Sequence, residues 1–336
     1  TLKMLVDSKN ASGGINGREI RLITYDDKSD QNEAVLAAKK LIESDKVVAV
    51  IGGTTSGNAM ATLPLFEKAH IPYISLASSK QITFPDDGSP RHWIFKTAPG
   101  DDIVIKRLLS YMKGQGWKNV AWLNVDNAFG SSGHTEFKHY APEYGVQAVL
   151  EETFEASVDD AKALLTRVKK ANPDAVIVWG TAQESAVVIK NIAELNLGIP
   201  VLASHGIGTP SFIDLAGKAA NGVVFPIGRI VVWKELPEDD PQKAVLAAYD
   251  EQYRAAFGSA PSTFGGHAWD AFHLLTKAIE DAGDDSEAIR DALEAQQRFV
   301  GVTGIFHYTP DDHTGLSAES MVIAEIVDGT FRLKER

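Results

Sequence analysis

The sequence predicts an α/β protein of two domains, each built on a parallel sheet with helices on both faces. Short apolar runs alternate along the chain with stretches whose apolar residues recur at helical spacing, which is the rhythm of βαβ units. The chain has 336 residues, enough for two domains at roughly 150 residues each. Apolar residues make up 44% of the chain, which suffices to fill two cores.

The predicted strands are short and apolar, as expected for strands buried on both faces of a parallel sheet. They lie at 47–52, 71–76, 120–125, 175–179 and 201–204. A final apolar stretch, 321–333, contains Asp328-Gly329, a dipeptide typical of tight hairpin turns. The sequence therefore ends in a predicted strand pair.

Helices are predicted between the strands and in a block near the end. In the second of them Ala34, Ala38 and Leu41 recur at helical spacing. The predicted helices span 2–9, 32–44, 57–69, 102–115, 156–171, 183–196, 241–256, 267–282 and 286–295, with connecting segments at 113–118 and 233–241. Because the rhythm requires a strand before the first helix, we expect that strand upstream of Thr1.

Charge and composition exclude several classes of function. The net charge of −12 disfavours binding to nucleic-acid phosphates and to anionic membranes. The absence of cysteine excludes disulfides, thiolate catalysis and zinc–thiolate sites. No apolar run reaches the ~18 residues that a membrane span needs. No export signal is present in the sequence, so we expect any such segment to have been removed or omitted.

No catalytic or cofactor motif stands out. His134 and His139 are five residues apart and face different sides of a helix, so we expect a solvated helix and not a metal site. Phosphate-binding and nucleophile-elbow motifs are absent. Acidic pairs occur at 26–27, 86–87 and 311–312, where solvated turns are expected and calcium or glycoside chemistry is the alternative. We predict neither a cofactor nor a metal.

Hydroxyl residues follow two neighbouring predicted strands. Thr54, Thr55 and Ser56 lead from the strand at 47–52 into a helix, and Ser78 and Ser79 follow the strand at 71–76. In open α/β sheets ligands bind at the carboxyl ends of strands, and a helix N-terminus suits a carboxylate. The alternative is that these residues only cap helices. Two such loops on adjacent strands favour an oxygen-binding site.

Large aromatic residues lie at other strand ends and helix starts. Phe129, Trp179 and Trp269 could each belong to a core, but as a set around a cleft they would form an apolar clamp. A further loop at the end of a predicted strand carries His205.

One run identifies a resemblance that covers nearly the whole chain. Gly-Gly-Ile-Asn-Gly-Arg-Glu-Ile at 13–20, continued by Asp-Asp-Lys-Ser-Asp at 26–30, closely resembles the type I periplasmic binding proteins of the Leu/Ile/Val-binding family. Further motifs similar to this family lie at 50–52, 55–57, 74–75 with 78–79, 95–99, 128–130, 268–271 and 328–329.

The resemblance implies two Rossmann-like lobes joined by three crossovers, which close on a solute by hinge motion. The first lobe would comprise 1–117 and 233–316, and the second 118–232 and 317–336. The family's first strand, which contributes to the pocket, is missing from this sequence. The family also implies a monomeric, non-enzymatic, exported receptor in the periplasm or another extracytoplasmic space, with or without a lipid anchor. Its partners would be the permease and ATPase of an ABC importer.

The resemblance also implies roles for individual residues. Ser56 would bind a ligand carboxylate through its hydroxyl and local N–H groups. Ser78 would contribute backbone, and Ser79 its hydroxyl, where the family often has threonine. Phe129 would pack over the ligand in place of a tyrosine, and Ala182 falls where amino-acid binders carry an aromatic residue.

His205 departs from the family in a way that bears on the ligand. It falls where amino-acid binders carry an acid that pairs with the ligand ammonium, and an unpaired buried ammonium is costly. An amine-free carboxylate, aromatic acids included, therefore fits better than a plain branched-chain amino acid. Trp179 and Trp269 fit such a ligand, and Trp269 falls at a tyrosine position of the family. Alternatively His205 is a turn residue outside the pocket, or Asp126 or Glu184 supplies the missing acid.

Three rival functions remain open at this point. A sensor of the same fold would report closure to a regulator instead of a permease. An α/β enzyme is disfavoured because no paired acid and base, metal set or phosphate loop is found. A purely structural module would have no need of hydroxyl and aromatic loops at its strand ends.

Overall fold

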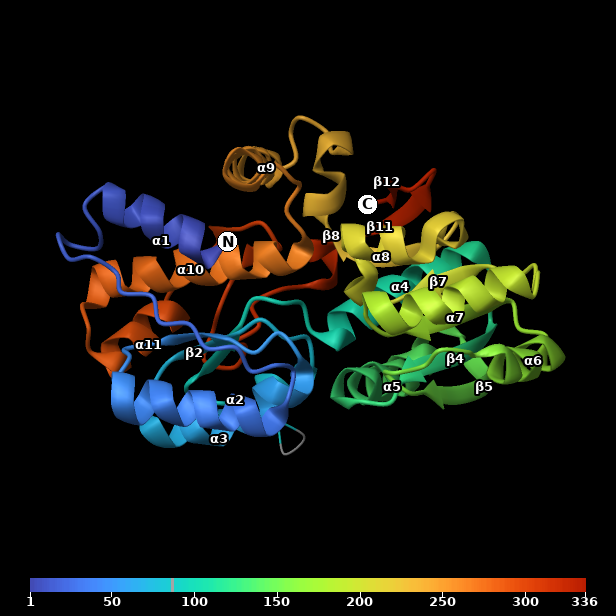
Figure 1. Cartoon of the computed structure of the whole chain (residues 1–336), viewed down its shortest axis with the longest axis horizontal. Helices are drawn as coiled ribbons and strands as arrows, with labels where there is room; N and C mark the ends of the chain where they lie inside the picture. The colour runs from blue at the N-terminus through green and yellow to red at the C-terminus, as the bar shows by residue number, and fades with distance from the viewer. Residues whose placement is uncertain (86–87) are drawn as a thin grey trace. The chain divides into compact units, whose positions relative to one another are not determined.

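The computed structural model describes residues 1–85 and 88–336, so the acidic pair at 86–87 lies outside the described residues. The chain forms two compact units (Figure 1). Unit 1 comprises Thr1–Gly100 and Asp239–Leu316, and unit 2 comprises Asp101–Glu238 and Ser317–Arg336. None of the helices in the described part of the chain is both long and apolar enough to cross a membrane.

The boundaries of the units differ from the predicted lobes. The sequence prediction gave 101–117 and 233–238 to the first lobe, whereas the structure places both in unit 2. Helix α4 (Asp101–Gln115) packs on strands of the unit 2 sheet, and the turn around Glu235 is bonded to the last strand through Arg332 and the N–H of Leu333. These contacts join both segments to unit 2.

Unit 1 contains a short parallel sheet between two layers of helices. Strands β1 (Val50–Gly52), β2 (Tyr73–Ser75) and β3 (Ile94–Lys96) pair in the order β1-β2-β3. Helices α1 (Leu2–Ala11) and α10 (Thr263–Ala282) lie on one side of β2 in Figure 1, and α2 (Gln31–Lys40) and α3 (Ser56–Ala69) on the other. The unit also holds α9 (Lys243–Phe257), α11 (Ser286–Glu294) and the antiparallel pair β9 (Phe299–Val300) and β10 (Ile305–Phe306).

Local chemistry explains where these helices begin. The Asp30 carboxylate accepts hydrogen bonds from the N–H groups of Asn32 and Glu33 and caps α2. The Ser262 hydroxyl accepts from the N–H of Gly265, so α10 begins at Thr263 and not at the predicted 267. In the apolar cluster that joins α3 to the sheet, Phe66 of α3 stacks on Tyr73 of β2, with ring centroids 4.6 Å apart.

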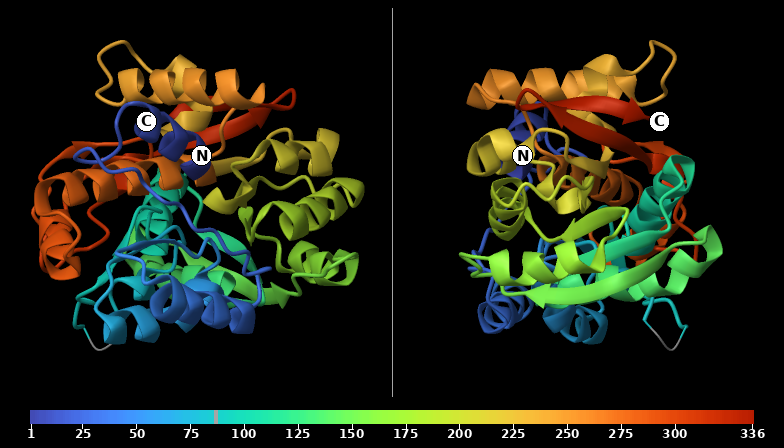
Figure 2. Two further views of the ribbon diagram at one scale, coloured as in Figure 1. Left: turned by 60° about the vertical axis from the view of Figure 1, so that its left-hand side comes forward. Right: turned by 90° about the vertical axis from the view of Figure 1, so that its right-hand side faces the viewer.

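Unit 2 contains a seven-stranded sheet that is parallel except at its C-terminal edge. The strand order is β12-β11-β8-β7-β6-β4-β5, and β11 is antiparallel to both β8 and β12. The strands are β4 (Asn119–Val125), β5 (Gln147–Phe154), β6 (Ala175–Trp179), β7 (Val201–Ala203), β8 (Val224–Gly228), β11 (Met321–Val327) and β12 (Thr330–Glu335). The hairpin predicted at Asp328-Gly329 is confirmed. The green β5 and red β12 form opposite edges of this sheet (Figure 2, right).

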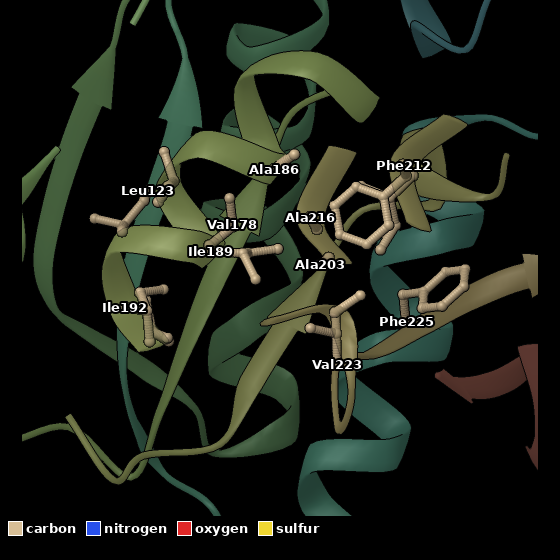
Figure 3. Close-up of a cluster of buried hydrophobic side chains, with 14 of the residues drawn as sticks. Leu123, Val178, Ala186, Ile189, Ile192, Ala203, Phe212, Ala216, Val223 and Phe225 are labelled. Atoms are coloured by element: carbon tan, nitrogen blue, oxygen red, sulfur yellow. The ribbon is translucent and has the colours of Figure 1, made fainter. Parts of the chain in front are cut away.

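Helices cover both faces of this sheet and one apolar cluster fills its core. In Figure 3 side chains of α7 (Ala182–Glu194) and α8 (Pro210–Ala216) meet those of the strands, with Ile189 and Phe212 beside Val178 and Phe225. Helix α6 (Lys162–Ala171) adds Leu165. It begins six residues later than the predicted 156, and the Asp160 carboxylate accepts from the Lys162 N–H at this start. Helix α5 (Ala128–Tyr140) completes the unit.

Candidate functional site

The two hydroxyl loops of unit 1 meet at the carboxyl ends of β1 and β2. Ser56 is the first residue of α3 and Ser79 follows β2, and both side chains are buried, with 2% and 1% exposure. The N–H of Ser79 donates to the Oγ of Ser56 at 3.3 Å. The structure thus brings together two residues that the sequence assigned to one oxygen-binding site.

This corner of unit 1 is rich in unused hydrogen-bonding groups. The Ser79 hydroxyl and the Asn58 amide nitrogen are buried and have no hydrogen-bond partner within the described residues. Thr55 occupies the N-cap position of α3, but its side chain makes no hydrogen bond to the helix. The first N–H groups of this 14-residue helix therefore have no side-chain acceptor at the N-cap. Such donors at the positive end of a helix dipole suit an anion. The site is suited to a carboxylate.

A buried lysine that sequence reasoning did not single out supports this loop. Lys96 of β3 is fully buried, and its Nζ donates to the carbonyl oxygens of Ser78 at 2.7 Å and Ser79 at 3.0 Å. The ammonium fixes the loop and adds positive charge near it. A lysine inside the otherwise apolar run at 94–96 was the sequence signal for this role. Ser78 is half-buried, and its carbonyl already accepts a hydrogen bond from Lys96.

In unit 2 the structure assembles three of the predicted site residues. The ring centroids of Phe129 and Trp179 are 5.7 Å apart, those of Phe129 and His205 5.6 Å, and those of Trp179 and His205 6.0 Å. Phe129, in the first turn of α5, is half-buried. Trp179, at the end of β6, has 0% exposure. Trp179 therefore supports Phe129 from behind, and Phe129 offers the accessible aromatic surface.

The loops that follow β6 and β7 are tied together beside His205. The Ser204 hydroxyl donates to the carbonyl of Gly180 at 2.6 Å and accepts from the N–H of Gly206. A Cβ on Gly206 would lie 2.8 Å from the Gly180 oxygen, so this approach requires glycine. His205 itself is buried, with 7% exposure. The loop geometry holds its imidazole against Phe129.

Asp126 and Glu184 are the two acids that could supply the carboxylate that amino-acid binders carry at the position of His205. Glu184 is buried, and its Oε1 accepts from the N–H and the hydroxyl of Thr181, which makes it part of the capping box of α7. Asp126 is exposed. Ala182, between them in sequence, is half-buried and packs against the unit 2 core. Only Asp126 of the two acids is not committed to a helix cap.

Trp269 packs in a different part of unit 1 from the hydroxyl loops. Its ring neighbours are Tyr249, His273 and Phe299, and it also packs against the apolar residues that join α1 to α10. Within the described residues, none of its ring contacts involves the loops of Ser56 or Ser79. Of the three aromatic residues expected from the sequence, Phe129 and Trp179 meet within unit 2, and Trp269 belongs to unit 1.

Other buried ionisable groups of unit 1 hold a loop together. The Asp270 carboxylate accepts from the N–H groups of Val302 at 2.6 Å and Thr303 at 2.7 Å, and burial raises its pKa to about 7. His267 contacts the Thr303 hydroxyl at 2.8 Å, and burial lowers its pKa to about 3. These groups fix the segment at 299–306 on α10 and are structural.

Across residues 1–85 and 88–336 no three histidine, aspartate or glutamate side chains are grouped as a metal site. His134 contacts Glu151 at 2.8 Å, and Glu136 is buried while His139 is exposed.

Comparison with known proteins places the chain among solute receptors. A family model described as periplasmic binding protein matches residues 1–330. A leucine-, isoleucine-, valine-, threonine- and alanine-binding protein of Pseudomonas aeruginosa is 25% identical over 87% of this chain and 75% of its own length. A Leu/Ile/Val-binding protein homologue of Brucella abortus is 26% identical over 93% of this chain and 81% of its own.

Solved structures agree over nearly the whole chain. An extracellular ligand-binding receptor from Rhodopseudomonas palustris superposes with a TM-score of 0.90 at 28% identity, covering 98% of this chain and 94% of the receptor. A branched-chain amino acid transporter substrate-binding protein from Streptococcus pneumoniae, solved with isoleucine, gives 0.85 at 26% identity, covering 100% of this chain and 93% of that protein. The chain therefore belongs to the type I periplasmic binding proteins, in the branch of the Leu/Ile/Val-binding proteins.

Proposed function

We propose that this protein is the extracytoplasmic solute receptor of an ABC importer, that it is not an enzyme, and that its solute is a small carboxylate. The observation that carries the proposal is the buried Ser79 hydroxyl, which has no partner within the described residues and lies beside the N-terminus of α3. A buried hydroxyl without a partner costs about 1–3 kcal/mol, so an incoming acceptor removes a penalty as well as forming a bond.

The proposed ligand is a carboxylate without an amino group, with aromatic acids favoured. In unit 2 the proposed contacts are Phe129, Ala182 and His205, with Trp179 behind them. The imidazole of His205 cannot form the ion pair with an ammonium that a carboxylate forms. The Glu184 carboxylate already accepts hydrogen bonds from the N–H and the hydroxyl of Thr181. The aromatic pair offers a flat apolar surface. The resemblance to the family implies that binding is accompanied by hinge closure.

A branched-chain amino acid is the second candidate. The Pseudomonas aeruginosa relative is named for binding leucine, isoleucine and valine, and the Streptococcus pneumoniae protein was solved with isoleucine. In this chain Asp126 is exposed and near Phe129 in sequence, and unlike Glu184 its carboxylate is not used in the capping box of α7. The two candidates therefore differ in one chemical group, the α-amine.

Calorimetry with matched pairs of acids separates these candidates. Protein stripped of ligand by unfolding and refolding is titrated with leucine and its 2-keto acid, with phenylalanine and phenylpyruvate, and with benzoate. We expect the amine-free member of each pair to bind at least tenfold more tightly. In a melting experiment an acid at 100 times its Kd should add about 2.7 kcal/mol. Tighter binding of leucine than of its keto acid would assign the site to amino acids.

A variant tests the residue on which the choice depends. His205→Glu supplies a carboxylate where amino-acid binders have one, so we expect it to reverse the preference within each pair. His139→Glu makes the same change at an exposed position of α5 and should leave the preference unchanged. No binding by either protein to any acid on the panel would argue for a different solute class.

The partner and location are part of the same proposal. A receptor of this kind would deliver its solute to a membrane permease and its ATPase, working as a monomer in the periplasm or another extracytoplasmic space. The alternative is a sensor of the same fold. Uptake of the bound acid by cells, lost when the receptor gene is deleted, distinguishes import from sensing.

A further inference from the structure

The hydrogen bonds that fix residues 299–306 on α10 also determine which ring nitrogen of His267 carries the proton. Nδ1 of His267 lies 2.8 Å from the hydroxyl oxygen of Thr303. The Thr303 hydroxyl also hydrogen bonds to the carboxylate of Asp270. Because an ionised carboxylate only accepts, the single proton of this hydroxyl points to Asp270, and the hydroxyl oxygen accepts from Nδ1–H of His267. Nε2 of His267 is therefore the nitrogen with a free lone pair.

The imidazole of His267 is neutral and its Nε2 is unused. Burial and, after it, the charge of Lys96 lower the pKa of His267 to about 3. The residue is 5% exposed, and its Nε2 has no hydrogen-bond partner among the described residues. A buried acceptor without a donor is costly, so a donor that reached Nε2 would remove a penalty as well as form a bond.

His267 lies at the same edge of the unit 1 sheet as the hydroxyl loops. Its backbone carbonyl accepts from the hydroxyl of Thr97 at 2.8 Å. Thr97 follows β3, and its N–H donates to the carbonyl of Ser75, the last residue of β2. The Lys96 ammonium, which acts on the His267 ring, is 3.0 Å from the carbonyl oxygen of Ser79. The first turns of α10 therefore border the corner that holds the unsatisfied Ser79 hydroxyl.

Given the carboxylate site of the proposed function, on which this depends, we infer that Nε2 of His267 accepts a hydrogen bond from a hydroxyl group of the ligand, so that hydroxy acids are the preferred solutes. The donor has to be uncharged, because the positive charge of Lys96 that opposes protonation of His267 opposes a ligand ammonium at Nε2 in the same way. A keto group has no proton to donate. Among acids of one carbon skeleton, the hydroxy acid alone uses both Ser79 and His267.

Calorimetry with acids of one carbon skeleton tests the hydroxyl group separately from the carboxylate. The titrations are made at pH 8, where Asp270, whose pKa is about 7, is ionised. The ligands are 4-methylpentanoate, its 2-hydroxy, 3-hydroxy and 2-keto derivatives, and leucine. We expect a hydroxy acid to bind about tenfold more tightly than the unsubstituted acid and the keto acid. Equal binding of all the amine-free acids would overturn the inference and leave the carboxylate site intact, whereas no binding of any acid would overturn both.

Two matched substitutions separate the hydrogen bond of His267 from its packing. His267→Phe keeps a ring in the buried position but removes the acceptor, so we expect the hydroxy acid and the unsubstituted acid to bind equally well. His273→Phe makes the same change further along α10, where the ring packs on Trp269, and should keep the tenfold preference. A preference for the hydroxy acid that survives in His267→Phe would overturn the inference.

Nitrogen NMR of histidine-labelled protein tests the same assignment without any substitution. In the ligand-free protein we expect the proton of His267 on Nδ1 and none on Nε2. Addition of the hydroxy acid should shift the Nε2 resonance, and addition of the unsubstituted acid should not. A proton on Nε2 in the ligand-free protein would contradict the inference, because that nitrogen could not then accept from a hydroxyl group.

Discussion

The Ser79 hydroxyl is buried without a partner in the described structure, which separates its effect on stability from its effect on binding. Ser79→Ala removes an unsatisfied polar group, so we expect the free energy of unfolding to stay the same or rise by up to about 1 kcal/mol. The same change should weaken binding of a carboxylate by about 1.5–3 kcal/mol, because a hydrogen bond to a charged acceptor is lost. Calorimetry and urea unfolding measure the two quantities.

Ser75→Ala is the matched control for that prediction. Ser75 is also fully buried, but its hydroxyl donates to the Gly53 carbonyl and accepts from the N–H of Ala77. Its removal should destabilise the protein by about 1 kcal/mol. A Ser79→Ala protein that unfolds as easily as Ser75→Ala and binds acids normally would show that Ser79 is a structural residue.

Also at the level of single residues, His273 makes unit 1 sensitive to acid. Burial, with a smaller effect of Lys9, lowers its pKa from 6.5 to about 4. The unfolded chain therefore takes up a proton on this histidine between pH 6.5 and 4 while the folded chain does not, so the stability it contributes is present above pH 6.5 and is lost as the pH falls. Asp270 has the opposite dependence, because its raised pKa favours the folded state at low pH.

A histidine variant isolates this contribution from that of Asp270. Between pH 7 and pH 5 we expect the free energy of unfolding of the unmodified protein to fall by about 1–2 kcal/mol more than that of His273→Gln. His139→Gln, at an exposed site in unit 2, should behave like the unmodified protein. Urea unfolding at both pH values gives the comparison. Parallel losses in all three proteins would show that His273 does not titrate differently in the folded state.

Among the elements, α5 packs on the sheet through a glycine. A Cβ on Gly133 would lie 2.2 Å from the indole of Trp179, which is fully buried. Gly133→Ala should therefore destabilise the protein by about 1–3 kcal/mol and displace the tryptophan that supports Phe129. Gly114, near the end of α4, has open space around it, and Gly114→Ala should be neutral or stabilising by up to about 1 kcal/mol. Thermal unfolding of both, with the tryptophan fluorescence as a second signal, compares them.

Elements with strong local signals were predictable from the sequence. Apolar runs at β4 and β6 and the hairpin turn of β11 and β12 were found within a residue or two. Strand β5 was missed because alternate residues of this edge strand are exposed, so it has no continuous apolar run. The assignment of α4 to unit 2 depends on its packing against β8 and β11, which no local pattern encodes.

The same division holds for the candidate site. Ser56 and Ser79 were identified because hydroxyl residues at consecutive strand ends must meet at one edge of a sheet. The supporting role of Lys96 depends on contacts between distant segments, and so does the packing of Trp269 against Tyr249 and Phe299. Residue type and spacing therefore indicated the candidate site, while the side-chain contacts around it became visible only in the folded chain.

At the scale of the whole molecule, we expect the net charge of −12 to slow the association of an anionic ligand at low salt. At long range a carboxylate approaches a protein of like charge, although at the proposed site the α3 N-terminus and Lys96 would attract it at short range. Salt screens the first effect more than the second, because the Debye length is about 10 Å at 0.1 M and the site is buried. Between 10 and 150 mM salt we expect the association rate constant of the bound acid to rise roughly twofold.

The neutral amide of the same acid is the control, and its association rate constant should not depend on salt. Stopped-flow tryptophan fluorescence measures both, and an association rate that falls with salt would mean that a local positive field, and not the net charge, governs the approach of the ligand.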